Sequence, residues 1–417
     1  MENTSIRLRC YPDQELRQTL AQWFGNARDI YNWGVELRRK NHERWIKKGK
    51  PKKWGWESFY TLAGKLTDLK QGAREYLQLS PAQTLVEALR NCERAFTNCF
   101  QHGYGYPRFK RKHDAQSLSF PPNSVKPHHL DVKGGYLYVK LPKTENLLKV
   151  RLHRELPEGR LIRTNISKHR SGEYFVSLLY EVEDGYYLKY NPDAKSKVGI
   201  DLNANPNTPL VCAWKNSEGE WREKVLGKEE RERLRRLESR RKRYQRKAAK
   251  QHALWKAKIP KPNKKTGEIQ YPSRKNLDKT YAHIAKIFQK EANQREDFAQ
   301  QLSAKLAKNF KLVKWEDINL RGITANGGNR KRKMNHGMVN LGFGRLRDLT
   351  ERKAGYYGHS SVQVSAKFTS QRCSKCGHIS KENRQSQSRF VCVECGFKIH
   401  ADRNAARNIC TRRPKAA

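Results

Sequence analysis

Four cysteines in the last fifty residues have the type and spacing of metal ligands. Cys373 and Cys376 form one Cys-x2-Cys pair, Cys392 and Cys395 form a second, and fifteen residues separate the pairs. This spacing is typical of a structural zinc ribbon, in which each pair supplies two thiolates to one tetrahedral ion. A glycine follows each pair, as a tight turn at positive φ requires. A redox dithiol needs only one pair, so the sequence predicts one structural Zn²⁺.

Three acidic residues stand where a charge is costly unless it is used or paired. Asp201 ends the apolar run VGID, Glu316 ends the run KLVKWE, and Asp402 begins a short segment with helical spacing. Asp402 by itself could be an ordinary helix cap. The neighbouring Asp317 should point to the opposite strand face, so Glu316 is preferred. The order of strands and helices around the three acids is that of a ribonuclease-H-like platform, whose carboxylates hold two Mg²⁺ ions for phosphodiester hydrolysis.

The overall charge indicates a polyanionic partner. The 417 residues include 87 Lys and Arg against 41 Asp and Glu, a formal net charge of +46. This charge is spread over many segments, which favours nucleic acid held over an extended surface. An anionic membrane is the alternative, but no stretch reaches the roughly 20 apolar residues that span a bilayer. The other five cysteines show no paired spacing and the first residues lack the core of a signal peptide, so we expect a cytoplasmic protein.

The elements that position these groups fall into two architectures. Residues 5–10 alternate apolar and basic side chains, as an edge strand would, and residues 13–100 have helical spacing. Period-two alternation from about 117 to 182 predicts several short strands. Together with residues 5–10, these strands suggest a small antiparallel barrel with the helical block inserted after its first strand.

A second architecture, of α/β type, is expected from residue 198 onward. Its strands alternate with a helix at 228–250, which carries twelve basic residues against four acids, and with a long amphipathic helix at 284–306. A solvated, salt-bridged helix is the simplest interpretation of 228–250, but the excess of positive charge favours a surface that faces nucleic acid. The basic segment GITANGGNRKRKMNHG, residues 322–337, is a candidate lid or insertion.

These motifs resemble those of the TnpB family over nearly the whole chain. Members of this family are transposon-encoded, RNA-guided DNA nucleases with a RuvC-type domain, and they are similar to type V CRISPR effectors. The runs that carry the resemblance are Gly199-Ile200-Asp201, Trp315-Glu316-Asp317, Ser370-Gln371 with the first cysteine pair, Asp402 to Ile409, and Pro107-Arg108-Phe109-Lys110. Two positions depart from the family pattern: Asn203, where glycine is usual, and His400, where many members have another aspartate.

The resemblance implies an α+β multidomain fold and a set of metal ligands. A helical recognition lobe would be inserted in a small antiparallel β-barrel, or wedge, and a ribonuclease-H-like RuvC α/β domain with an inserted zinc ribbon would follow. Asp201, Glu316 and Asp402 would be the catalytic ligands of Mg²⁺. The implied boundaries are 1–12 and 106–185 for the wedge, 13–105 for the recognition lobe, 186–196 for a linker, 197–368 and 397–417 for the nuclease domain, and 369–396 for the ribbon.

The resemblance also implies a guide RNA and a target double-stranded DNA as partners. The protein would cut guide-matched DNA next to a short flanking motif, and DNA binding would associate it with the prokaryotic nucleoid. The oligomeric state is left open, with a monomer slightly favoured. Gln83, Arg108, Lys110 and Arg111 are candidate nucleic-acid contacts. Three alternatives remain: a miniature type V CRISPR effector, a nuclease-inactive RNA-guided DNA-binding regulator, and an unguided, structure-specific resolvase. The three acids argue against the inactive regulator, and the large helical and barrel lobes argue against the resolvase.

Overall fold

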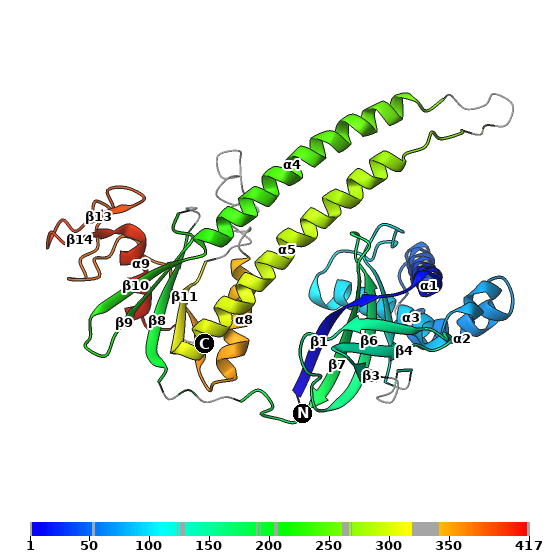
Figure 1. The fold of residues 1–417 in the computed structure, drawn as a ribbon, viewed down its shortest axis with the longest axis horizontal. Helices are drawn as coiled ribbons and strands as arrows, with labels where there is room; N and C mark the ends of the chain where they lie inside the picture. Colours follow the sequence, from blue (N-terminus) through cyan, green and yellow to red (C-terminus); the bar gives the residue numbers. More distant parts are fainter. Residues whose placement is uncertain are drawn as a thin grey trace. The chain divides into compact units, whose positions relative to one another are not determined.

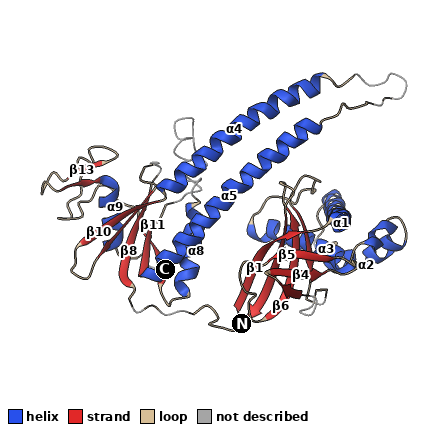
Figure 2. Ribbon diagram, viewed as in Figure 1, coloured by secondary structure: helices blue, strands red, loops and turns tan. Residues whose placement is uncertain are grey.

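The chain divides after Tyr186 into two units, residues 1–186 and 187–417, each with its own core in the computed structural model (Figure 1). The structure describes residues 2–51, 55–122, 124–125, 130–188, 191, 193–203, 207–260, 267, 269–318 and 342–414. The candidate lid at 322–337 lies outside these residues. Both units combine helices and strands, which confirms an α+β multidomain protein (Figure 2).

Unit 1 contains a seven-stranded antiparallel sheet in the order β2-β6-β7-β1-β5-β4-β3. Its strands are β1 (Glu2–Tyr11), β2 (Gln116–Phe120), β3 (Leu130–Lys133), β4 (Tyr136–Lys140), β5 (Leu147–Arg151), β6 (Arg160–Lys168) and β7 (Tyr174–Val182). Within the described residues no pairing joins β2 to β3, so the sheet is open and no closed barrel is found.

The expectation of an edge strand near the amino terminus is wrong. β1 lies inside the sheet, paired with β7 on one side and with β5 on the other. Its residues alternate between exposed and buried positions along nearly the whole strand. Alternation shows only that one face of a strand is solvated. In an antiparallel sheet with one face in water, the central strands alternate in the same way as the edge strands.

The helices of unit 1 follow β1 and pack against the sheet. They are α1 (Gln14–Lys47), α2 (Phe59–Gln71), the 3₁₀ helix η1 (Glu75–Leu79) and α3 (Ala82–His102). α1 begins where the Asp13 side chain accepts a hydrogen bond of 2.8 Å from the backbone N–H of Leu16. Trp23 of α1 and Leu8 of β1 are buried in one shared core, so helices and sheet stabilise each other.

Unit 2 is built on a mixed five-stranded sheet in the order β10-β9-β8-β11-β12. Its main strands are β8 (Lys195–Leu202), β9 (Leu210–Lys215), β10 (Trp221–Leu226), β11 (Phe310–Glu316) and β12 (Ser360–Val364), and β13 (Arg389–Val391) and β14 (Lys398–His400) form a separate pair. β11 is parallel to β8 and to β12, whereas β9 is antiparallel to β8.

Helices cover both faces of the unit 2 sheet. They are α4 (Lys228–Ala257), α5 (Lys275–Asn309), α8 (Phe343–Gly355) and α9 (Ala401–Thr411). α5 and α8 share a core with Ile200 and Trp315, while α9 packs beside Val211 and Ala213 on the other face. α4 and α5 lie side by side as a long hairpin that extends away from the sheet (Figure 1). None of the described helices has the length and apolar run that a bilayer crossing requires.

Candidate functional site

The two acids carried by strands lie at the carboxyl ends of neighbouring strands, at the same edge of the unit 2 sheet. β8 and β11 are parallel neighbours, and Trp315 of β11 lies opposite Ile200 of β8. Asp201 and Glu316 are the next residues along the two strands. Because side chains alternate along a strand, these acids lie on the sheet face opposite to the apolar side chains of Ile200 and Trp315.

Asp402 joins this pair because α9 packs very closely on β8. A Cβ atom placed on Gly199 would lie 2.3 Å from the carbonyl oxygen of Ala406 and 2.3 Å from the backbone nitrogen of Cys410. Glycine therefore allows the helix backbone to touch the strand. Asp402 lies in the first turn of α9 and is only 1% exposed, which places its carboxylate beside the edge that carries Asp201.

A buried lysine fixes the other end of α9. Lys314 shares the strand face of Glu316, and its Nζ donates hydrogen bonds of 3.0 Å and 2.6 Å to the carbonyl oxygens of Cys410 and Arg412. Burial lowers the pKa of Lys314. These bonds satisfy carbonyl groups that the end of a helix leaves without intrahelical partners, so the position of α9 along β11 is defined at both ends.

Two of the three acids have raised pKa values. Burial, followed by the carboxylates of Glu316 and Asp402, raises the pKa of Asp201 well above its ordinary value. Burial also raises the pKa of Glu316, although a hydrogen bond from Thr369 opposes this shift. Like charges held together away from water favour a proton or a cation at the site.

Three polar neighbours of the acids were not foreseen from the sequence. The Thr208 hydroxyl donates a 2.8 Å hydrogen bond to Oδ2 of Asp402, and the Thr369 hydroxyl donates one to Glu316. A guanidinium nitrogen of Arg384 lies 3.8 Å from Oδ1 of Asp402. The hydroxyl donors are 194 and 53 residues away from their acceptors along the chain, so no local spacing could have indicated them.

The donor set suits a hard divalent cation. Three carboxylates from two strands and one helix converge, and carboxylate oxygens are the ligands that Mg²⁺ prefers. The oxygens of the three carboxylates lie farther apart than the sulfurs of the four cysteines. Within the described part of the chain, only the cysteines bring their ligand atoms within 4.8 Å of one another. A bound cation would offset the repulsion among the three carboxylates.

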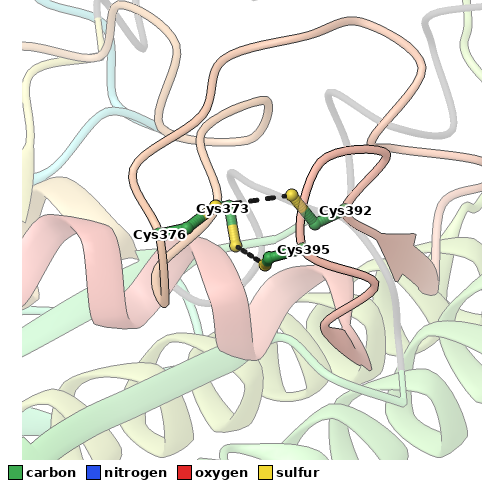
Figure 3. Close-up of side chains that lie close together, drawn as sticks. All are labelled: Cys373, Cys376, Cys392 and Cys395. Carbon is green, nitrogen blue, oxygen red and sulfur yellow. Dashed lines mark hydrogen bonds between the residues drawn. The ribbon is translucent and has the colours of Figure 1, made fainter.

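The four predicted zinc ligands come together in one cluster (Figure 3). The sulfurs of Cys373 and Cys395 are 3.7 Å apart, and those of Cys376 and Cys392 are 3.6 Å apart. Four sulfurs held about 2.3 Å from one tetrahedral ion would be separated by about 3.8 Å. The turns after each pair use glycine at φ 85° and 66°, as expected from the sequence. The cluster therefore has the geometry of a Zn²⁺ site.

Two asparagines of α9 connect the cysteine cluster to the acidic site. The Asn404 side chain accepts a hydrogen bond from the backbone N–H of Ser374 and donates one to the carbonyl oxygen of Arg372. Asn408 donates to the carbonyl oxygens of Arg372 and Thr369. The helix that carries Asp402 thus also holds the chain segment that enters the first cysteine pair.

Replacing Cys392 by serine is expected to remove the zinc ion. Three remaining thiolates would bind Zn²⁺ more weakly, and the segment that carries the cysteines would lose the free energy that a bound metal contributes to folding. Zinc per chain, measured by atomic emission, should fall from one to near zero, and the melting temperature of unit 2 should fall by about 5 °C or more. Cys99→Ser, in unit 1, is the matched control and should keep one zinc. Full zinc occupancy in Cys392→Ser would contradict the assignment.

The predicted nucleic-acid contacts lie on the first turn of α3 and on the loop before β2. Gln83, Arg108 and Arg111 are exposed. Lys110 is half-buried, with its Nζ 3.9 Å from the centre of the Tyr31 ring. Lys110 therefore has a packing role, while the exposed side chains stay available to a partner.

Three family models match separate parts of the sequence. A helix-turn-helix domain model matches residues 1–47, a model described as probable transposase matches 177–326, and the Cas12f1-like TNB domain matches 343–409. In the structure, the first of these segments is the strand β1 followed by the single helix α1. The third segment includes the cysteine cluster and Asp402.

Curated relatives and a solved structure match nearly the whole chain. A putative RNA-guided DNA endonuclease of Streptomyces pristinaespiralis is 28% identical over 97% of this chain and 88% of its own length. The putative RNA-guided DNA endonuclease InsQ of Escherichia coli K12 is 25% identical over 97% of this chain and 91% of its own length. The cryo-EM structure of a Cas12f1–sgRNA–target DNA complex has a TM-score of 0.50 at 14% identity, with 98% of each chain covered. This last likeness concerns the fold alone.

Proposed function

Because the chain belongs to the TnpB family, we propose that it is a transposon-encoded, RNA-guided DNA endonuclease. It would cut DNA that matches its guide RNA, next to a short flanking motif. The observation that carries this proposal is the convergence of Asp201, Glu316 and Asp402 at one edge of the unit 2 sheet. Relatives similar over almost the full length supply the guided activity.

The proposed nuclease site uses the three acids as ligands of two Mg²⁺ ions. When bound, the ions would activate a water molecule for attack on the phosphodiester and stabilise the charge on the leaving oxygen. Thr208 orients the Asp402 carboxylate and Thr369 orients that of Glu316. Arg384, close to Asp402, adds a positive charge at the edge that the phosphate must approach, which favours binding of the anionic backbone.

The remaining parts of the chain have proposed roles in holding nucleic acid. Residues 13–105 would act as the recognition lobe, and 1–12 with 106–185 as the wedge, in the form of an open sheet rather than a closed barrel. After a linker at 186–196, residues 197–368 and 397–417 would form the RuvC-like nuclease, with a zinc-bearing ribbon at 369–396. A net charge of +46 suits a protein that holds RNA and an RNA–DNA hybrid by their backbones, while base pairing selects the sequence.

Replacing Thr208 by valine is expected to lower the cleavage rate about tenfold, because the Asp402 carboxylate loses the hydroxyl that orients it. Valine keeps the shape of threonine, and Thr208→Ser restores the donor, so the serine variant should stay within about threefold of the unchanged protein. Initial rates at several Mg²⁺ concentrations measure the effect. Equal rates for the valine variant at every concentration would show that this hydrogen bond does not position the acid.

The experiment that tests the proposed function begins with the RNA that copurifies with the protein. Sequencing should find a structured RNA that ends in a variable segment, and the RNA–protein complex should cut duplex DNA matching that segment when Mg²⁺ is present. RNA from the flank of the protein's own gene supports the transposon origin. RNA from a repeat array would assign the chain to the CRISPR effectors instead. A complex that leaves matched, motif-bearing duplex intact would contradict nuclease activity.

A further inference from the structure

A cavity of about 490 Å³ in unit 1 has no part in the nuclease site. The second half of α1, residues 56–58, the second half of α3 and Tyr106 line it. Cavities of 300–1,000 Å³ are typical of sites for small organic groups, so the cavity has room for a single nucleotide.

Aromatic rings form much of the cavity wall and remain exposed. The His42 ring stacks on Trp45 and Trp56, with ring centres 5.6 Å and 6.2 Å apart and planes within 28° of parallel. Trp56 is 51% exposed, and Phe100, on α3, is 67% exposed. A core would have covered these rings. Several large exposed rings around one concave surface are typical of a binding site.

Cations accompany the rings, and the acids of the cavity are already paired. The Arg38 guanidinium lies 5.1 Å from the centre of the Phe96 ring, and the Lys50 ammonium lies 6.0 Å from that of Trp45. Glu93 pairs with Arg38, and Glu57 pairs with Lys65. Lys47, the last residue of α1, and Lys48, the residue after it, are exposed. One arginine, Arg38, and two acids, Glu57 and Glu93, line the cavity. Lys65 beside Glu57, Lys50 beside Trp45 and the Arg39 guanidinium, 5.5 Å from the centre of the Tyr106 ring, give the surroundings a positive balance, which is complementary to an aromatic group that carries a phosphate.

We propose that this cavity binds an unpaired nucleobase of the guide RNA. This inference rests on the proposed function. Proteins recognise RNA mainly through unpaired bases that stack on aromatic rings, with basic side chains on the phosphates. In a guide–target hybrid the bases are paired, so the unpaired base comes from the folded part of the RNA. Thr97 and Gln101 line the cavity and make no side-chain hydrogen bond within the described residues, which leaves both able to bond the edge of the base.

Trp56→Ala in the full-length protein tests this proposal. The probe is a fluorescein-labelled, single-stranded RNA of about 12 nucleotides, compared with the same RNA annealed to its complement. Affinity for the single strand should fall about tenfold, and affinity for the duplex should stay within about twofold. Trp56→Phe should retain most of the affinity. Tyr60→Ala is the matched control, because Tyr60 is 83% exposed but lies outside the cavity.

Photo-crosslinking gives a second measurement that does not depend on a variant. The same RNA carrying 4-thiouridine should label peptides that contain residues 42–45 or Trp56. If the purified protein retains RNA but Trp56→Ala binds the single strand unchanged, the cavity proposal fails and the guided nuclease stands. If the protein retains no RNA, the proposed function fails. If Trp56→Ala loses more affinity for single-stranded DNA than for single-stranded RNA, the cavity binds target DNA and the proposal is overturned.

Discussion

Replacing Asp201 by asparagine is expected to lower DNA cleavage at least about a thousandfold while RNA binding stays unchanged. The amide is nearly the same size as the carboxylate, but it removes a charge that would hold the two proposed Mg²⁺ ions. Unit 1, which carries the proposed RNA contacts, is untouched by the substitution. Single-turnover cleavage of guide-matched duplex and a filter-binding assay with the copurified RNA measure the two quantities.

The same substitution is expected to stabilise the protein in the absence of Mg²⁺. Burial and the neighbouring acids raise the pKa of Asp201 above its unfolded value, so the folded chain binds more protons than the unfolded chain over that interval. The free energy of unfolding therefore falls as pH rises from about 3.8 through the higher folded pKa. Without a carboxylate at position 201, the free energy of unfolding falls less as the pH rises. At pH 7 in buffer without Mg²⁺, with the zinc site left intact, the melting temperature of Asp201→Asn should be about 3–10 °C higher.

Asp317→Asn is the matched control for this prediction. Asp317 follows Glu316 directly, but its side chain is expected to point to the other face of the strand. Cleavage by Asp317→Asn should stay within about threefold of the unchanged protein, whereas Glu316→Gln should resemble Asp201→Asn. A severe loss in Asp317→Asn with an active Glu316→Gln would show that the wrong one of the two neighbouring acids was chosen.

Replacing Gly199 by alanine is expected to destabilise unit 2 by about 3 kcal/mol or more. The added methyl group would sit 2.3 Å from backbone atoms of α9, and backbone cannot move aside as the end of a flexible side chain can. α9 must shift away from β8, and Asp402 shifts with it. We expect a fall in melting temperature of about 6–12 °C and a loss of cleavage larger than the loss of stability alone explains.

Gly344→Ala is the control for the Gly199 variant. Gly344 lies in α8 of the same unit, and no atom of the described residues lies within 4 Å of the position that its Cβ would take. Alanine is the better helix former, so this variant should be as stable as the unchanged protein or slightly more stable. Calorimetry of both variants distinguishes the steric effect from a general intolerance of unit 2 to substitution. Equal melting temperatures for the two would contradict the close contact of α9 with β8.

Local patterns were sufficient for the ligands but not for their surroundings. The cysteine spacing predicted a cluster, and the apolar runs before Asp201 and Glu316 predicted strands that end in an acid, because such patterns depend on neighbouring residues. Thr208 and Thr369 reach their acids across long separations in the sequence. Nothing in the run VGID shows that Gly199 must lack a side chain, because the atoms that it would meet belong to α9, about two hundred residues later.

The topology was also only partly predictable. Alternation along β1 showed that one face is solvated but not that the strand lies between β5 and β7. Strand periodicity likewise indicated a set of antiparallel strands without indicating whether the first and last of them pair. That choice depends on twist and on the connections, and within the described residues the sheet stays open.

The asparagine contacts between α9 and the cysteine segment link the proposed Mg²⁺ site to the zinc site. Cleavage should therefore depend on the supply of both metals. If the cysteines lose zinc, the backbone that Asn404 and Asn408 hold is released, and the first turn of α9 loses part of its support. Unit 1 has a separate core, so RNA loading would persist. In a zinc-starved cell, we therefore expect RNA-loaded copies that occupy matching DNA without cutting it, and these copies would compete with intact ones for the same targets.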